Sequence, residues 1–178
     1  VLKEAKASAL DLYLQSIEQD LSIMATNDDV RTALKAYMDG WFALGFGQKE
    51  KLQTAYITGN PNETGQKHKL DAANDGSAYS AAHKRYHPWL RHFLETKGYY
   101  DVFLFSPGGD LVYTVFKELD YATNLVNGPY KDSGLGKVFR MARDNPKSGY
   151  QAFVDFEPYA PSADAPASFI AQPILDET

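Results

Sequence analysis

The chain has 178 residues, enough for one substantial domain or for a helical module joined to a smaller mixed one. Its net charge is −5 and its basic residues are scattered, which argues against a nucleic-acid partner and against a peripheral membrane surface, because both need a basic face. Cysteine is absent, which excludes zinc–thiolate sites, thiol nucleophiles and disulfides.

The first segment carries a regular apolar pattern. Apolar residues recur at spacings of three and four, as in a heptad seam, at Ala7, Leu10, Leu14, Ile17, Leu21 and Met24. This pattern predicts either an amphipathic helix that faces the core of a monomer or a helix that also meets a partner helix. In the second case the dimer-helix residues are Leu10, Leu14, Ile17, Leu21 and Met24. Because Val1 falls inside the helical pattern, we expect a piece of a longer polypeptide.

Three more helices are predicted before residue 98. Capping residues at 26–29 open a helix over 28–44, and a further helix over about 48–57 ends before Gly59-Asn60-Pro61. Ser77 is a candidate cap for a long helix to Lys97, which Gly98 terminates. We expect Pro88 to kink this helix or to start a new one after His87.

After Gly98 the pattern becomes strand-like. Aromatic and β-branched residues over 99–105 and 111–116 flank a Ser-Pro-Gly-Gly-Asp turn, which predicts a hairpin. A helix over 134–144 and strands over 150–156 and 167–174 follow. The order of elements predicts an α+β fold, with a helical region over 1–97 and an antiparallel sheet over 98–178 forming one structural unit.

No catalytic or metal-binding motif stands out. His83 and His87 are four residues apart and could share a metal, but the Glu that a zinc protease needs after the first histidine is missing. The Gly-rich turns lack the P-loop and dinucleotide fingerprints, and no serine lies in a nucleophile-elbow motif. We therefore expect no enzymatic activity, no metal and no cofactor.

Polar residues within aromatic strands are the remaining candidates for a site. Tyr113 and Lys117, four apart on one expected strand, would project to the same face. Asp155 interrupts the apolar run Phe153-Val154-Asp155-Phe156. Its carboxylate would accept a ligand's ammonium group, pair with a basic residue of the fold or face solvent, and spacing alone favours the last two.

Several segments together resemble a known family. They are Tyr86–Arg91, Gly98–Phe105, Gly109–Glu118, Asp155–Ser162 and Ala165–Ile174. This series resembles the Cache-type (PAS-like, PDC) extracytoplasmic sensor domains of methyl-accepting chemotaxis receptors, and also of some histidine kinases and nucleotide cyclases. The similarity runs from about Asn60 to Ile174.

The resemblance implies a periplasmic or other extracytoplasmic domain of an inner-membrane receptor, anchored through flanking segments. It implies a PAS-like antiparallel sheet with a ligand pocket on one face and a homodimer formed through the N-terminal helix. The sheet of such domains is closed by a strand after the Pro-Ile-Leu-Asp region, so we expect this chain to lack its last strand. The pocket residues implied are His87, Trp89, Arg91, Tyr113, Lys117, Asp120, Tyr130 and Asp155.

In this scheme Arg91 or Lys117 would hold a ligand carboxylate and Asp155 an amine, for a ligand that is an amino acid, an organic acid or an amine. Three rivals remain. The domain could serve a histidine kinase or cyclase, it could be an ectodomain that dimerises without binding a ligand, or it could be a soluble enzyme or stand-alone binding module. The last would need its own N-terminus and a catalytic cluster.

Overall fold

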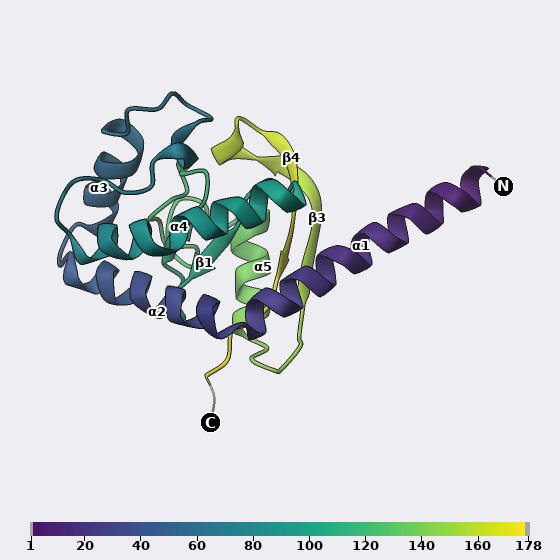
Figure 1. Cartoon of the computed structure of the whole chain (residues 1–178). Coiled ribbons are helices and arrows are strands. Elements are labelled where there is room, and N and C mark those ends of the chain that lie inside the picture. The colour runs from purple at the N-terminus through teal and green to yellow at the C-terminus, as the bar shows by residue number, and fades with distance from the viewer. Residues whose placement is uncertain (1, 177–178) are drawn as a thin grey trace.

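The structure, a computed structural model, describes residues 2–176, apart from the side chains of residues 2 and 4. The first helix, α1 (Leu2–Thr26), projects from the body so that its N-terminal half lies alone (Figure 1). Only its last turns join the core, where Met24 and Ala25 are buried. Asn27 separates α1 from α2 (Asp28–Ala43), and its side chain caps α2 by accepting hydrogen bonds from the N–H groups of Asp29 and Val30.

The helical body is built on the packing of α2 against α4 (Ala78–Lys97). Gly40 of α2 permits the close approach, since a Cβ atom there would stand 2.6 Å from the Cα atom of Tyr79. Between the two helices the chain forms α3 (Gln48–Gln53), a π-helical turn over Thr54–Thr58 and a 3-10 turn over Lys67–Lys69. The expected helix over 48–57 is therefore an α-helix as far as Gln53 and a π-helix after it.

The helix α4 begins and ends where the sequence indicates. The Ser77 side chain accepts from Ser80 N at 3.0 Å, and Gly98 adopts a φ of +73° after the last turn. The expected new helix after His87 does not form, because α4 continues through Pro88. The proline removes the donor for the Lys84 carbonyl, and the Lys84 and Arg85 side chains on that turn are exposed, so solvent can bond this carbonyl instead.

The strands form two antiparallel pairs, so the α+β class is confirmed. β1 (Phe103–Phe105) pairs with β2 (Leu111–Thr114), and β3 (Ala152–Tyr159) pairs with β4 (Ala165–Ala171). Within residues 2–176 these are separate two-stranded sheets rather than one sheet. β1 and β4 approach through side chains, with the Phe103 and Phe169 ring centroids 6.2 Å apart. The closing strand expected from the resemblance falls outside the described residues.

Two apolar clusters hold the body together. The first lies among α2, α4 and β2 and includes Tyr37, Leu90 and Tyr113. It therefore contains residues of both the expected helical region over 1–97 and the expected sheet region over 98–178. The second lies where α5 (Gly134–Arg143) packs on β3 and β4, and it includes Phe139 and Phe169.

The second strand ends earlier than expected. The sequence predicts a strand to Phe116, whereas β2 ends at Thr114 and Lys117 adopts a φ of +61°. The Thr114 hydroxyl accepts a hydrogen bond from Lys117 N at 3.0 Å, which turns the chain out of the strand. None of the helices described over 2–176 combines the length and the hydropathy that a membrane span requires.

Candidate functional site

Five buried tyrosines cluster where the helices meet β2, and three of them surround one lysine ammonium group. We call this group the tyrosine box: Tyr37, Tyr56, Tyr79, Tyr113 and Tyr121, with Lys117 among them. The rings come from α2, the π-helical turn, α4, β2 and the loop after β2. Each ring is fully buried, and the Tyr37 and Tyr113 ring centroids lie 4.6 Å apart. The box therefore draws on five separate segments of the chain.

The ammonium group of Lys117 sits against three of these rings. Its Nζ atom lies 4.4 Å from the Tyr113 centroid, 5.1 Å from that of Tyr121 and 5.8 Å from that of Tyr56. It donates one hydrogen bond to the Thr114 carbonyl, and no ion pair of the described residues includes it. Only 3% of the residue is exposed, and burial lowers the pKa of Lys117 to about 7.

The tautomer of His87 follows from its partners. Nε2 lies 2.6 Å from the carbonyl of His68, which can only accept, so Nε2 carries the hydrogen. Burial, then the nearby Lys117 charge, lowers the pKa of His87 to about 2, so the ring is neutral. Nδ1 then accepts a hydrogen bond from the hydroxyl of Tyr113 at 2.7 Å. His87 therefore joins the loop before α4 to β2.

His83 stacks on His87 one turn earlier in α4, with ring centroids 4.3 Å apart. Its Nδ1 atom donates to the Asp71 carbonyl at 2.6 Å, and burial holds the pKa of His83 well below its usual range. Nε2 of the neutral ring is therefore an acceptor, and this buried atom has no hydrogen-bond partner. The ring lies 4.5 Å from that of Tyr56, beside the tyrosine box.

Most phenol groups of the box have partners. Tyr121 donates to the hydroxyl of Tyr79 at 2.9 Å, and Tyr79 donates to the Val112 carbonyl. The Tyr56 hydroxyl bonds the Ser80 hydroxyl at 2.8 Å and accepts from Ala73 N at 3.3 Å. The hydroxyl of Tyr37 is the exception among the five, because it is buried without a partner.

Two buried carboxyl groups lie close to Lys117. Asp120 follows it by three residues, and Asp101 interacts with its charge, which partly opposes the lowering of the lysine pKa. Asp101 accepts from Val102 N at 2.7 Å, from Val115 N at 2.9 Å and from the Thr114 hydroxyl at 3.0 Å. Burial, together with the charge of Asp120, raises the pKa of Asp101 to about 7. Asp120 accepts from the Tyr159 hydroxyl, and burial raises its pKa to about 6.

The structure brings three of the eight expected site residues into one cluster, namely His87, Tyr113 and Lys117. Asp120 is buried beside the cluster but is turned towards Tyr159. The Arg91 side chain is engaged in the fold, since it pairs with Asp71 at 2.8 Å and donates to the His68 carbonyl at 2.9 Å.

The other three lie elsewhere. Trp89 is 40% exposed on α4, and the Asp155 side chain is exposed on β3. Tyr130 packs on the second apolar cluster. The arrangement with Asp155 as the amine acceptor and Arg91 as a carboxylate anchor is therefore not assembled in this structure.

Sequence reasoning missed four box residues, Tyr37, Tyr56, Tyr79 and Tyr121, and it did not place His83 among the expected site residues. One signal was available in the sequence. Tyr79, His83 and His87 follow at intervals of four, which places all three on one face of a helix. Polar aromatic residues repeating along the buried face of a helix indicate a polar interior. The other three tyrosines lie far apart in the sequence and carry no local signal.

The expected dimer seam divides into two parts along α1. Leu10 and Leu14 are 57% and 41% exposed, on the projecting half of the helix. Ile17 and Leu21 are half-buried, and Met24 is buried in the core of its own chain. Tyr13 is a further exposed apolar residue on the projecting half.

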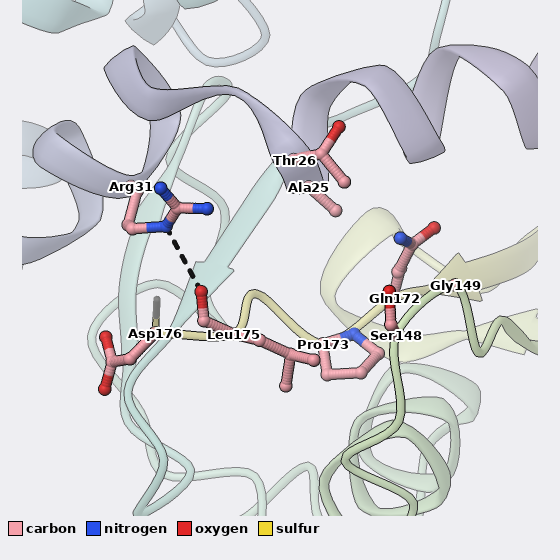
Figure 2. Close-up of a pocket in the computed structure, with 9 residues that line it drawn as sticks. All are labelled: Ala25, Thr26, Arg31, Ser148, Gly149, Gln172, Pro173, Leu175 and Asp176. Carbon is pink, nitrogen blue, oxygen red and sulfur yellow. Dashed lines mark hydrogen bonds between the residues drawn. The ribbon is translucent and has the colours of Figure 1, made fainter. Parts of the chain in front are cut away.

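Two shallow surface hollows lie outside the tyrosine box. The larger, of about 480 Å³, lies between the junction of α1 with α2 and the segment after β4 (Figure 2). There Arg31 Nε donates to the Leu175 carbonyl at 3.2 Å. The smaller, of about 380 Å³, is lined by residues that flank the site residues in sequence, namely Tyr100, Phe116 and Glu118.

Within the described part of the chain, no three histidine or acidic side chains converge as a metal site would require. Nδ1 of His83 and Nε2 of His87 each donate to a backbone carbonyl. Comparisons with protein-family models, with curated proteins and with solved structures found no match.

Proposed function

We propose that this chain is a small-molecule-binding sensor domain, and that the tyrosine box is its binding site. The observation that carries the proposal is the Lys117 ammonium group, buried among aromatic rings without a carboxylate within ion-pairing distance. Burying a charge costs several kcal/mol, roughly, and the nearby Asp101 carboxyl offsets this cost only in part, since the pKa of Lys117 stays lowered. Perturbed charged groups of this kind gather at functional sites.

The unpaired atoms support the same location. Buried polar atoms are normally hydrogen-bonded, to the protein or to a bound molecule. Of the four buried side-chain atoms without a partner among the described residues, two belong to the cluster around the box, namely Nε2 of His83 and the hydroxyl of Tyr37; the others are His68 Nδ1 and Asp120 Oδ1. Aromatic rings with a few polar groups commonly line small-molecule sites. In the box these rings touch, so an occupant must part them.

The proposed output runs through α1. Its last turn packs in the same apolar cluster as Tyr37 and Tyr113, so a ligand that moves the rings acts on the base of the projecting helix. Leu10 and Leu14 would contact the same helix of a second copy. Together with the Cache-like sequence pattern, this supports an extracytoplasmic, membrane-anchored receptor of the chemotaxis type. A ligand would change the pairing of the two helices, provided it binds one arrangement better than the other.

Cysteine crosslinking tests this output directly, because the chain has no native cysteine. We expect Leu10→Cys and Leu14→Cys to form disulfide-linked dimers under mild oxidation. Gln19→Cys is the control, since it is exposed and lies roughly 180° around the helix from Leu10. Equal crosslinking at all three positions would contradict a specific helix pair.

Ligand binding is tested by the unfolding temperature, which rises when a molecule binds the folded state. A screen of organic acids, amino acids and amines should yield at least one molecule that raises it. The rise should be lost in Tyr113→Phe, which cannot donate to His87, and kept in Tyr100→Phe, whose ring is exposed. If no molecule raises the unfolding temperature, the alternative of a dimerising ectodomain without a ligand is favoured.

A further inference from the structure

We infer that the fold contains a proton-controlled junction, in which the loop over 115–124 closes against the end of β3 when the carboxyl of Asp120 is neutral and loosens when it ionises. Two carboxyl groups of the loop meet two hydroxyl groups there. Tyr159, the last residue of β3, donates to Asp120, and Ser162 of the following turn donates to Glu118. The junction does not involve a ligand in the tyrosine box, so this inference goes beyond the proposed function.

The junction lies between the two apolar clusters. Tyr121 of the loop belongs to the first cluster, whereas Tyr159 belongs to the second. The backbone of the loop is also fixed to α3, because the side chain of Gln53 donates to the carbonyls of Leu119 and Tyr121 at 3.2 and 2.7 Å. A change at Asp120 therefore acts on the contact between the helical body and the β3–β4 sheet, while the attachment of the loop to α3 is kept.

Asp120 is buried without a cation. Only 1% of the residue is exposed, and none of the ion pairs that the described residues form includes Asp120 or Glu118. The oxygen Oδ2 accepts from Tyr159, whereas Oδ1 is buried without a hydrogen-bond partner. A carboxylate in such a place costs far more to bury than a neutral carboxyl. The geometry by itself thus favours the uptake of a proton.

Acidic and phenolic groups surround Asp120. Glu118 shares its loop, and the buried Asp101, which precedes β1, interacts with its charge. Tyr159 of β3 and Tyr130 of the loop before α5 lie close enough that burial, and then the charge of Asp120, raises the pKa of both phenols. Repulsion from the two neighbouring carboxyl groups adds to the cost of ionising Asp120 in the closed loop.

The backbone of the loop favours opening. Lys117 and Ala122, on either side of Asp120, adopt left-handed φ angles of +61° and +62°. A residue with a Cβ atom is strained in this conformation, so the closed loop stores energy that opening releases. Lys117 does not neutralise Asp120, because its ammonium group lies 4.4 Å from the ring centroid of Tyr113 and donates to the Thr114 carbonyl. Closure is therefore sensitive to the cost of burying Asp120.

The protonation of Asp120 sets the pH range. Burial raises the pKa of Asp120 to about 6, with an opposing effect of the Tyr159 hydrogen bond and a further rise from Glu118. In an open loop the solvated carboxyl would have its ordinary pKa of 3.8. Between these two values the closed loop binds the extra proton. The ratio of open to closed loops should therefore rise by up to about tenfold per pH unit from about pH 4 to 6 and level off above pH 6.

Hydrogen exchange of the backbone amides, followed by NMR and corrected for the intrinsic pH dependence of exchange, measures this opening. We expect the amides of 117–123 and of Tyr159 to open about 25-fold more at pH 7 than at pH 4.5. Asp120→Asn removes the charge with little change in shape, so this rise should disappear. Asp155→Asn is the matched control, since Asp155 is an exposed residue on β3, and it should keep the rise.

The titration of Asp120 itself is a second test, which does not depend on how well Asp120→Asn folds. The carboxyl carbon of Asp120, followed by NMR in labelled wild-type protein, should titrate with a midpoint near pH 6. Tyr159→Phe removes a donor that favours the charged form, so the midpoint should rise by about one pH unit. A wild-type midpoint near pH 4, or a rise in opening that persists in Asp120→Asn, would overturn the inference.

Discussion

The hydroxyl of Tyr113 donates a hydrogen bond to Nδ1 of His87 over 2.7 Å, and this bond ties β2 to α4 in the centre of the molecule. It requires a neutral imidazole, because a protonated His87 would present an N–H at Nδ1. The bond therefore links the packing of the two halves to the protonation of a single histidine.

The first prediction concerns the pH dependence of that histidine. The pKa of His87 is about 2 in the folded state and near 6.5 when unfolded, so between these values the unfolded chain binds the extra proton. The stability that neutral His87 supplies is present above pH 6.5 and is lost as the pH falls. His87→Gln should destabilise the protein at pH 7.5, and the difference from wild type should shrink by about 1.4 kcal/mol per pH unit below pH 6.5.

Urea unfolding at several pH values from 4.5 to 8 measures this difference. His83, Asp101, Asp120 and Lys117 also titrate nearby, but they are shared by both proteins, so the difference isolates His87. A constant difference across this range would contradict the neutral tautomer assigned here.

The second prediction is that Lys117→Met stabilises the ligand-free domain. The desolvation of Lys117 outweighs its attraction to the nearby Asp101 carboxyl, so removing the charge should raise the free energy of unfolding by about 1–4 kcal/mol at pH 6. The folded pKa of Lys117 is lowered to about 7, so the cost of its charge is full below pH 7 and disappears as the pH rises towards 10.5. The gain in the free energy of unfolding should therefore be largest below pH 7 and should disappear towards pH 10.5. A loss of stability in Lys117→Met at pH 6 would show that Lys117 has a strong partner.

A third prediction concerns the contact between α2 and α4. Gly40→Ala would place a Cβ atom 2.6 Å from the backbone of Tyr79, so the helices must separate. We expect a loss of about 1–3 kcal/mol, measured by thermal or urea unfolding. Gly45→Ala is not a matched control, because its φ is +67°. Ala43→Gly, at an exposed position in the last turn of α2, tests helix propensity instead, with an expected loss of at most about 1 kcal/mol.

The fourth prediction separates structure from function at Tyr37. Its hydroxyl is buried without a partner, so Tyr37→Phe should unfold at the same temperature as wild type or a higher one. Differential scanning calorimetry without ligand measures this. A clear loss of stability would mean that the hydroxyl is bonded in solution and is not available to a ligand.

Local signals in the sequence predicted the helices well. Asn27, Ser77 and Gly98 cap or end helices through their own side chain or backbone, so their residue types identify the boundaries. Of the two outcomes expected at Pro88, a kink or a new helix, the new helix does not occur, because the cost of a proline depends on whether solvent can reach the carbonyl that it leaves unbonded. The early end of β2 depends on one hydroxyl, that of Thr114, and the strand pattern carries no sign of it.

The site was predicted only in part, because it is assembled by tertiary contacts. His87, Tyr113 and Lys117 were identified from a family pattern and meet in the structure. The prediction placed Lys117 on the same strand as Tyr113, whereas Lys117 lies in a turn after that strand has ended. Tyr37 and Tyr121 join the box from segments over 80 positions apart, and no spacing rule relates them.

The most direct test of the tyrosine box as a binding site is NMR of the protein with labelled tyrosine rings and labelled backbone amides. The molecule that most raises the unfolding temperature would be titrated into wild type. The box predicts that the ring signals of Tyr37 and Tyr113 shift, while that of the exposed Tyr100 stays in place. Unchanged box signals, with backbone shifts confined to the hollow beside Arg31 and Gln172 in Figure 2, would contradict it.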